Sequence, residues 1–143
     1  AAGDAPAAAH FWLGRAYGEQ AQRANVLRQA ALARKTKAAF DRAVQLDPDL
    51  LDAREGLLQF YLLAPGILGG SEARAREQAQ EIRRRNAYRG AFAEATIATR
   101  RRDWAGAARA LEGAVAQFPD SAGAWFQLTT TYAQQQDWPR AFA

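Results

Sequence analysis

Residues 103–138 read DWAGAARALEGAVAQFPDSAGAWFQLTTTYAQQQDW, so the dipeptide Asp-Trp returns after 34 residues. Within this stretch, Trp125, Leu128, Thr129 and Tyr132 are spaced so that they share one face of a helix with 3.6 residues per turn. The Pro-Asp-Ser turn at 119–121 disfavours helical backbone before it and supplies a cap after it. The stretch therefore predicts two helices joined by a short turn, and a fixed period of this length is typical of a helical repeat protein.

The amino-acid composition agrees with a purely helical fold. The 143 residues include 36 Ala but only three Val and three Ile, so β-branched residues are too few for a sheet. A chain of this length buries a hydrophobic core without disulfides or metal ions. We therefore expect one all-α domain that spans residues 1–143.

The same pattern recurs along the chain. The first copy begins at His10 and continues with Leu13, Gly14 and Tyr17, and an insertion lengthens it before its second helix reaches Phe40. In the second copy the motif begins at Arg54, and an extended turn separates its two helices. The copies span approximately residues 7–50, 51–87, 88–121 and 122–143, of which the last is truncated.

These motifs resemble the tetratricopeptide repeat family, bacterial-type, whose pattern is W-x2-L-G-x2-Y followed by A-x3-F and P. The resemblance implies an α-α superhelix, a right-handed solenoid of antiparallel helix pairs with three complete repeats and a partial fourth. The chain departs from the pattern at four places. Arg54 and Ala91 replace the large aromatic residue, Glu94 replaces Leu, and Ala87 replaces Pro. We expect irregular packing in the second and third repeats.

Several functional classes are excluded by what the sequence lacks. There is no Cys, which removes disulfides, thiolate metal sites and thiol nucleophiles, and there is one His, His10. A single His argues against a histidine-built metal site or a Ser-His-Asp triad. We expect His10 to have a packing role, with a ligand or pH role as the alternative. We therefore expect no enzymatic activity, no cofactor and no metal.

The sequence holds few signals for the cellular location of the protein. No apolar run approaches the roughly 20 residues that span a bilayer. The small residues of the segment 1–6 resemble the start of a mature exported protein, although a domain boundary looks the same. An exported or periplasmic location is favoured over a cytoplasmic one.

The candidate binding groove follows from the family resemblance. In this family the first helices of successive pairs line a concave surface, and the residues one and five places after the aromatic slot face it. These positions hold Phe11 and Arg15, Glu55 and Gln59, Phe92 and Thr96, and Phe126 and Thr130. Exposed aromatic rows mark binding surfaces, so we expect a non-catalytic scaffold that binds a protein or peptide there. The alternative is that the superhelix covers the three Phe side chains.

One known binding mode of the family is not reproduced here. Its carboxylate-clamp members use Lys and Asn on these helices to hold an acidic C-terminal tail. The matching positions carry Phe11, Arg15, Gln59, Arg89 and Ala93. We therefore do not expect binding of a chaperone's acidic tail.

Clustered arginines suggest an alternative function. The segment 72–102 contains nine Arg and four Glu, while the whole chain has a net charge of +4. A nucleic-acid adaptor would use a basic patch formed by Arg83, Arg84, Arg85, Arg89, Arg100, Arg101 and Arg102. Both triplets also fall in the last turns of expected helices, where cations complement the exposed carbonyl groups. No nucleic-acid motif accompanies them, so we expect no nucleic-acid partner.

Two irregular segments carry local expectations. We expect the inserted residues after Tyr17 to be helical with a break near Asn25, and Val26, Leu27, Ala30 and Leu32 to cover the first turn of the solenoid. In the segment 64–71 we expect Ser71 to cap the next helix, and Ile67 and Leu68 to pack against the neighbouring helices. The alternatives for this segment are an exposed partner-binding tip or an anion site.

Overall fold

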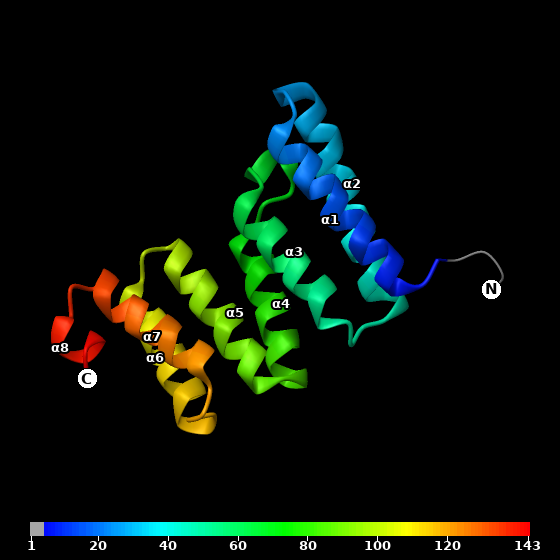
Figure 1. Cartoon of the computed structure of the whole chain (residues 1–143). Coiled ribbons are helices and arrows are strands. Elements are labelled where there is room, and N and C mark those ends of the chain that lie inside the picture. Colours follow the sequence, from blue (N-terminus) through cyan, green and yellow to red (C-terminus); the bar gives the residue numbers. More distant parts are fainter. Residues whose placement is uncertain (1–4) are drawn as a thin grey trace. The chain divides into compact units, whose positions relative to one another are not determined.

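The structure, a computed structural model, describes residues 5–143 as a set of helices, and no strand occurs among them. The all-α prediction is therefore confirmed. The part of the export-like start that comprises residues 1–4 lies outside the described residues. The elements in Figure 1 are α1 (Ala7–Arg23), α2 (Val26–Leu46), α3 (Leu51–Leu63), η1 (Gly66–Leu68), α4 (Glu72–Arg85), α5 (Ala87–Arg100), α6 (Trp104–Gln117), α7 (Ala122–Gln134) and α8 (Trp138–Ala141).

The chain divides into two compact units, which we describe one at a time. The N-terminal unit comprises residues 1–78 and the C-terminal unit residues 79–143. In the N-terminal unit α1 and α2 pack side by side along their length, and α3 packs on both of them (Figure 1). The break between α1 and α2 falls at the predicted place, because the Asn25 side chain accepts a hydrogen bond from the Arg28 N–H at 3.0 Å.

The ring of Phe40 lies at the centre of the N-terminal unit. Both Gly14 of α1 and Gly56 of α3 face this ring, and a Cβ atom at either position would lie within 2.8 Å of it. Leu57 and Leu58 are buried nearby on α3. Gly14, the small residue of the repeat pattern, therefore lets α1 and α2 approach each other closely.

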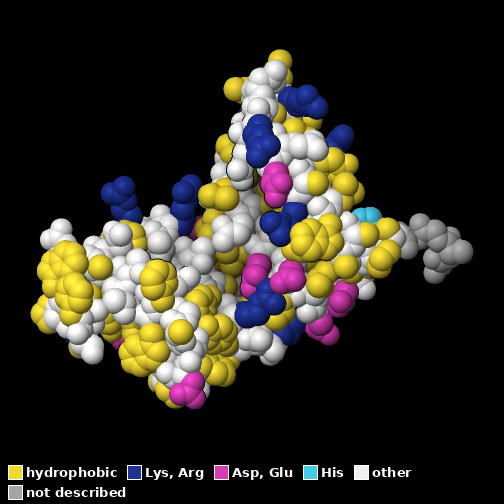
Figure 2. All heavy atoms as spheres, viewed as in Figure 1, with side chains coloured by type: hydrophobic (Ala, Val, Ile, Leu, Met, Phe, Trp, Pro, Cys, Tyr) yellow, Lys and Arg dark blue, Asp and Glu magenta, His cyan; other side chains and the backbone are white. Residues whose placement is uncertain are grey.

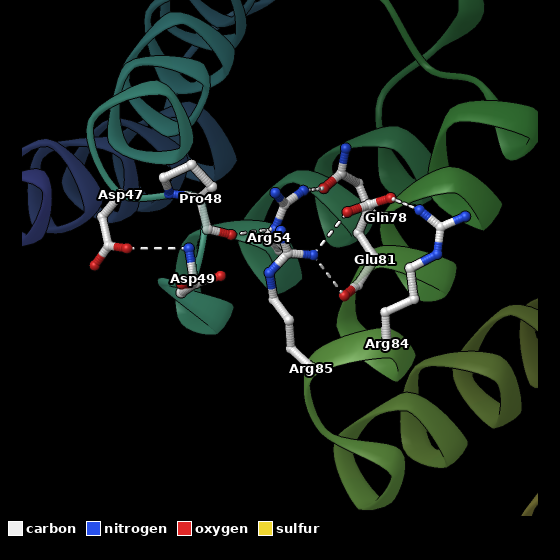
Figure 3. A network of polar contacts seen from close by, with 8 residues as sticks. All are labelled: Asp47, Pro48, Asp49, Arg54, Gln78, Glu81, Arg84 and Arg85. Atoms are coloured by element: carbon white, nitrogen blue, oxygen red, sulfur yellow. Dashed lines mark hydrogen bonds and ion pairs between the residues drawn. The ribbon is translucent and has the colours of Figure 1, made fainter.

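A buried arginine fastens the turn between α2 and α3. Arg54 donates from Nε to the carbonyl oxygen of Pro48 at 2.7 Å and from Nη1 to Oε1 of Gln78 at 3.2 Å (Figure 3). In the same turn the Asp47 carboxylate accepts the Asp49 N–H at 3.0 Å. The sequence Asp47-Pro48-Asp49 also predicts a side-chain cap for the next helix, but this prediction is wrong, because the N-cap of α3 is Leu50, whose side chain makes no such bond.

Backbone hydrogen bonds stabilise the extended turn of residues 64–71. Gly70 donates its N–H to the Pro65 carbonyl, Gly69 adopts φ 104°, and the Ser71 N–H reaches the carbonyl of Tyr61 at 2.9 Å. The Ser71 side chain accepts the Arg74 N–H at 3.3 Å, so the predicted cap is confirmed. A Cβ atom at Gly70 would lie 1.8 Å from the Ala64 oxygen, which only glycine permits.

The C-terminal unit is organised around α6. This helix packs against α5 on one side and α7 on the other, and α8 packs on α7. The core joins small residues of α5 to larger ones of α6 and α7, among them Ala95, Leu111, Leu128 and Tyr132. Asp103 caps α6 and Asp137 caps α8 in the same way, each accepting the N–H three residues later. The 34-residue offset in the sequence therefore marks equivalent helix starts.

Two expectations about apolar residues are wrong in part. Of the four inserted residues expected to cover the first turn of the solenoid, Leu32 is buried and Ala30 is half-buried, whereas Val26 and Leu27 are 81% and 88% exposed. Ile67 is 93% exposed, whereas Leu68 is half-buried and η1 contacts α2. Both segments lie at turns, where an apolar side chain has few neighbours to pack against. Within residues 5–143, no helix combines the length and the apolar character that crossing a membrane requires.

Candidate functional site

Two of the predicted groove pairs belong to the C-terminal unit, one on α5 and one on α7. Phe92 and Thr96 belong to α5, and Phe126 and Thr130 belong to α7. In each pair the threonine Oγ1 donates to the carbonyl oxygen of the phenylalanine at 2.8 Å. The two helices therefore present the same arrangement, and we call these four residues together with Tyr88 the α5–α7 face.

Tyr88 joins the two helices of this face. Its hydroxyl is 2.7 Å from Oγ of Ser121, the N-cap of α7, and its ring centroid lies 4.7 Å from that of Phe92 and 5.2 Å from that of Phe118. Sequence reasoning missed Tyr88. The available signal was its spacing of four residues from Phe92, since residues i and i+4 lie on the same side of a helix.

Exposure differs sharply along the α5–α7 face. Phe92 is half-buried and packs against the core, whereas 73% of the surface of Phe126 is exposed. Trp125 beside it is also exposed, and its indole N–H donates to the Pro119 carbonyl at 2.7 Å. Figure 2 shows hydrophobic side chains gathered over α6, α7 and α8 on the face in view. On this face α5 therefore contributes half-buried aromatic rings, and α7 contributes an exposed one.

The other groove residues lie in the N-terminal unit, where the predicted aromatic residue packs against two other rings. Phe11 is half-buried, with ring centroids 5.2 Å from Trp12 and 6.1 Å from Phe40. Arg15 lies over the Trp12 ring and 3.8 Å from Glu19. On α3, Glu55 is half-buried and Gln59 is exposed. Trp12, next to Phe11, is exposed, and the repeat pattern did not mark it as a candidate.

The first arginine triplet is paired with carboxylates. Arg84 and Arg85 each lie 2.7 Å from a carboxylate oxygen of Glu81, as Figure 3 shows. Arg83 holds both oxygens of Glu94 at 2.6 and 2.7 Å. These contacts offset the positive charge that a nucleic acid would need. Of the second triplet, Arg100 lies in the last turn of α5, Arg101 is its C-cap, and Arg102 follows with φ 58°.

A pocket of about 370 Å³ opens between α5 and α6. Its walls are small side chains, including Ala87 and Ala91 of α5 and Ala110 and Ala114 of α6. Three charged residues line it, namely Arg83, Glu94 and Arg109. The sequence did not predict this pocket. Three of its lining residues, Ala87, Ala91 and Glu94, are nevertheless among the four departures from the repeat pattern.

Among residues 5–143, no three side chains of His, Asp or Glu lie close enough together to hold a metal ion. His10 is half-buried, and its Nε2 atom is buried without a hydrogen-bond partner. Comparison with protein-family models found no match, and comparison with curated proteins found no significant match.

Proposed function

We propose that the chain is a tetratricopeptide-like α-solenoid and a non-catalytic scaffold that binds a peptide or protein partner through the α5–α7 face. The observation that carries the proposal is the exposure of Phe126 on α7, at the position equivalent to Phe92 on α5, in a unit where Tyr88 of α5 bonds to the N-cap of α7. An exposed aromatic ring next to apolar surface is a typical anchor of a protein interface.

The polar atoms of the face suit an extended chain. The hydroxyl hydrogens of Thr96 and Thr130 are directed to carbonyl groups of their own helices. Each hydroxyl oxygen can therefore accept an N–H from a bound peptide backbone. Since Tyr88 and Ser121 already hold α5 and α7 together, the face loses little conformational freedom on binding.

The test uses peptides selected from a displayed random library against the whole protein. Their affinity is then measured by titration calorimetry for the wild type, for Phe126→Ala and for Phe142→Ala. Phe142 is a matched control, because it is also a strongly exposed phenylalanine of the C-terminal unit but lies next to Trp138, away from α5. We expect Phe126→Ala to weaken binding about tenfold or more and Phe142→Ala to change it less than about twofold.

The opposite pattern contradicts the proposal. If the selected peptides bind Phe126→Ala as tightly as the wild type, while circular dichroism shows equal helicity, the α5–α7 face is not the binding site. Phe126 is the better probe than Phe92, since truncation of the half-buried Phe92 also removes contacts to the core.

A further inference from the structure

The pocket between α5 and α6 lies where the repeat pattern lacks its large side chain. Ala91 corresponds to Trp125 of the next repeat and to Arg54 and His10 of the earlier ones. With alanine at this position, about 370 Å³ stay open between the two helices. This volume falls in the range of small-molecule sites, which begins near 300 Å³.

The shape of the pocket follows from glycines on both of its helices. Gly90 of α5 lets the backbone of Arg83 approach, since a Cβ atom at Gly90 would lie 2.5 Å from the Arg83 Cα. This approach holds the Arg83 guanidinium over α5, where Glu94 fixes it through both carboxylate oxygens. On α6, Gly113 has open space where a side chain would begin.

The charges that line the pocket favour an anion. Glu94 offsets the charge of Arg83, whereas Arg109 has no hydrogen bond or ion pair with any residue in the range 5–143. The hydrogen bonds of Arg83 to Glu94 use Nη1 alone, so its Nε and Nη2 groups also retain N–H donors. The pocket therefore combines the small side chains of its alanines with one uncompensated positive charge and with guanidinium donors suited to a carboxylate.

We propose that this pocket binds a carboxylate ligand whose apolar body is about the size of one aromatic side chain. The body fills the space above Ala91, and the carboxylate pairs with Arg109. The ligand is either a free small acid or the C-terminal residue of a peptide, since both present the same chemistry. The site lies on α5 and α6 and does not depend on the binding function proposed for the α5–α7 face.

The test follows backbone amide signals of the whole protein by NMR during titration with N-acetyltryptophan. We expect the signals of Gly106 and Gly113 to shift and to saturate, because both residues line the pocket. N-acetyltryptophanamide, which has the same body without the charge, should bind about tenfold more weakly. A second titration uses the peptide Gly-Gly-Ser-Trp, whose C-terminal carboxylate is free. Tighter binding of this peptide than of N-acetyltryptophan identifies a chain end as the ligand, and equal or weaker binding identifies a free acid.

Three variants separate the pocket from general charge effects. Arg109→Gln should weaken binding about tenfold, whereas Arg100→Gln, which removes an exposed arginine of α5 outside the pocket, should leave it within about twofold. Ala91→Trp should fill the pocket and abolish binding. Equal losses in Arg109→Gln and Arg100→Gln, or binding that survives both Arg109→Gln and a folded Ala91→Trp, would overturn the proposal. So would the absence of any shift at Gly106 and Gly113 with the wild type.

Discussion

At the scale of single residues, Arg54 shows how a departure from the repeat pattern acquires a structural role. Arg54 is buried, and its guanidinium donates a hydrogen bond to the carbonyl oxygen of Pro48 in the turn after α2. We expect Arg54→Ala to lower the free energy of unfolding by about 2 to 3 kcal/mol, because it removes two hydrogen bonds of a buried charged group. Urea unfolding followed by circular dichroism measures the change. Arg34→Ala, an exposed arginine of α2, is the control and should cost less than about 0.5 kcal/mol.

Tyr132 provides a prediction for alkaline pH. Burial of the phenol and its hydrogen bond to the Glu112 carboxylate raise the pKa of Tyr132 from 10.0 to about 12. A raised pKa means that the protonated phenol stabilises the folded state fully below pH 10, and that this contribution is lost as the pH rises toward 12.

We expect the stability difference between the wild type and Tyr132→Phe to shrink by about 1 kcal/mol between pH 9 and pH 11. Urea unfolding at the two pH values measures it. A stability difference that stays constant over this range would show that the phenol titrates normally.

At the scale of elements, several helix starts could be predicted from the sequence, whereas the exposure of apolar side chains at the turns could not. Ser71 and Ser121 cap their helices as the sequence indicated, and Asn25 caps α2 at the predicted break, because a cap is a local interaction within three residues. The exposure of Leu27 and Ile67 depends on which helices are near each turn, and this information is absent from local spacing.

The glycines of the turn at 64–71 give a matched pair of substitutions. Gly70→Ala should lower the free energy of unfolding by more than about 2 kcal/mol, since its Cβ would overlap the Ala64 carbonyl oxygen. Gly66→Ala should change it by less than about 1 kcal/mol, because the space around Gly66 is open. Thermal unfolding of both variants measures the difference. Equal stability of the two variants would show that the turn relaxes around Gly70.

At the scale of the whole molecule, the sequence predicted the helical class and several helix starts, but only part of the candidate site. The 34-residue offset located Phe92 and Phe126 at equivalent places on α5 and α7. Tyr88 and its bond to Ser121 span 33 residues, and the pocket beside Ala91 exists only because α5 and α6 pack around a missing side chain. Such features depend on three-dimensional packing, so the repeat pattern alone does not predict them.

A partner that binds the α5–α7 face contacts Phe126, so a crosslinker at this position captures it. We would place a photoreactive phenylalanine analogue at position 126 or, separately, at position 142, and expose each protein to light in an extract of its source cells. We expect a discrete protein to be crosslinked from position 126 and not from position 142, and an excess of a selected peptide to compete with it. The same crosslinked proteins from both positions, or none from position 126, would show that no partner binds this face at Phe126.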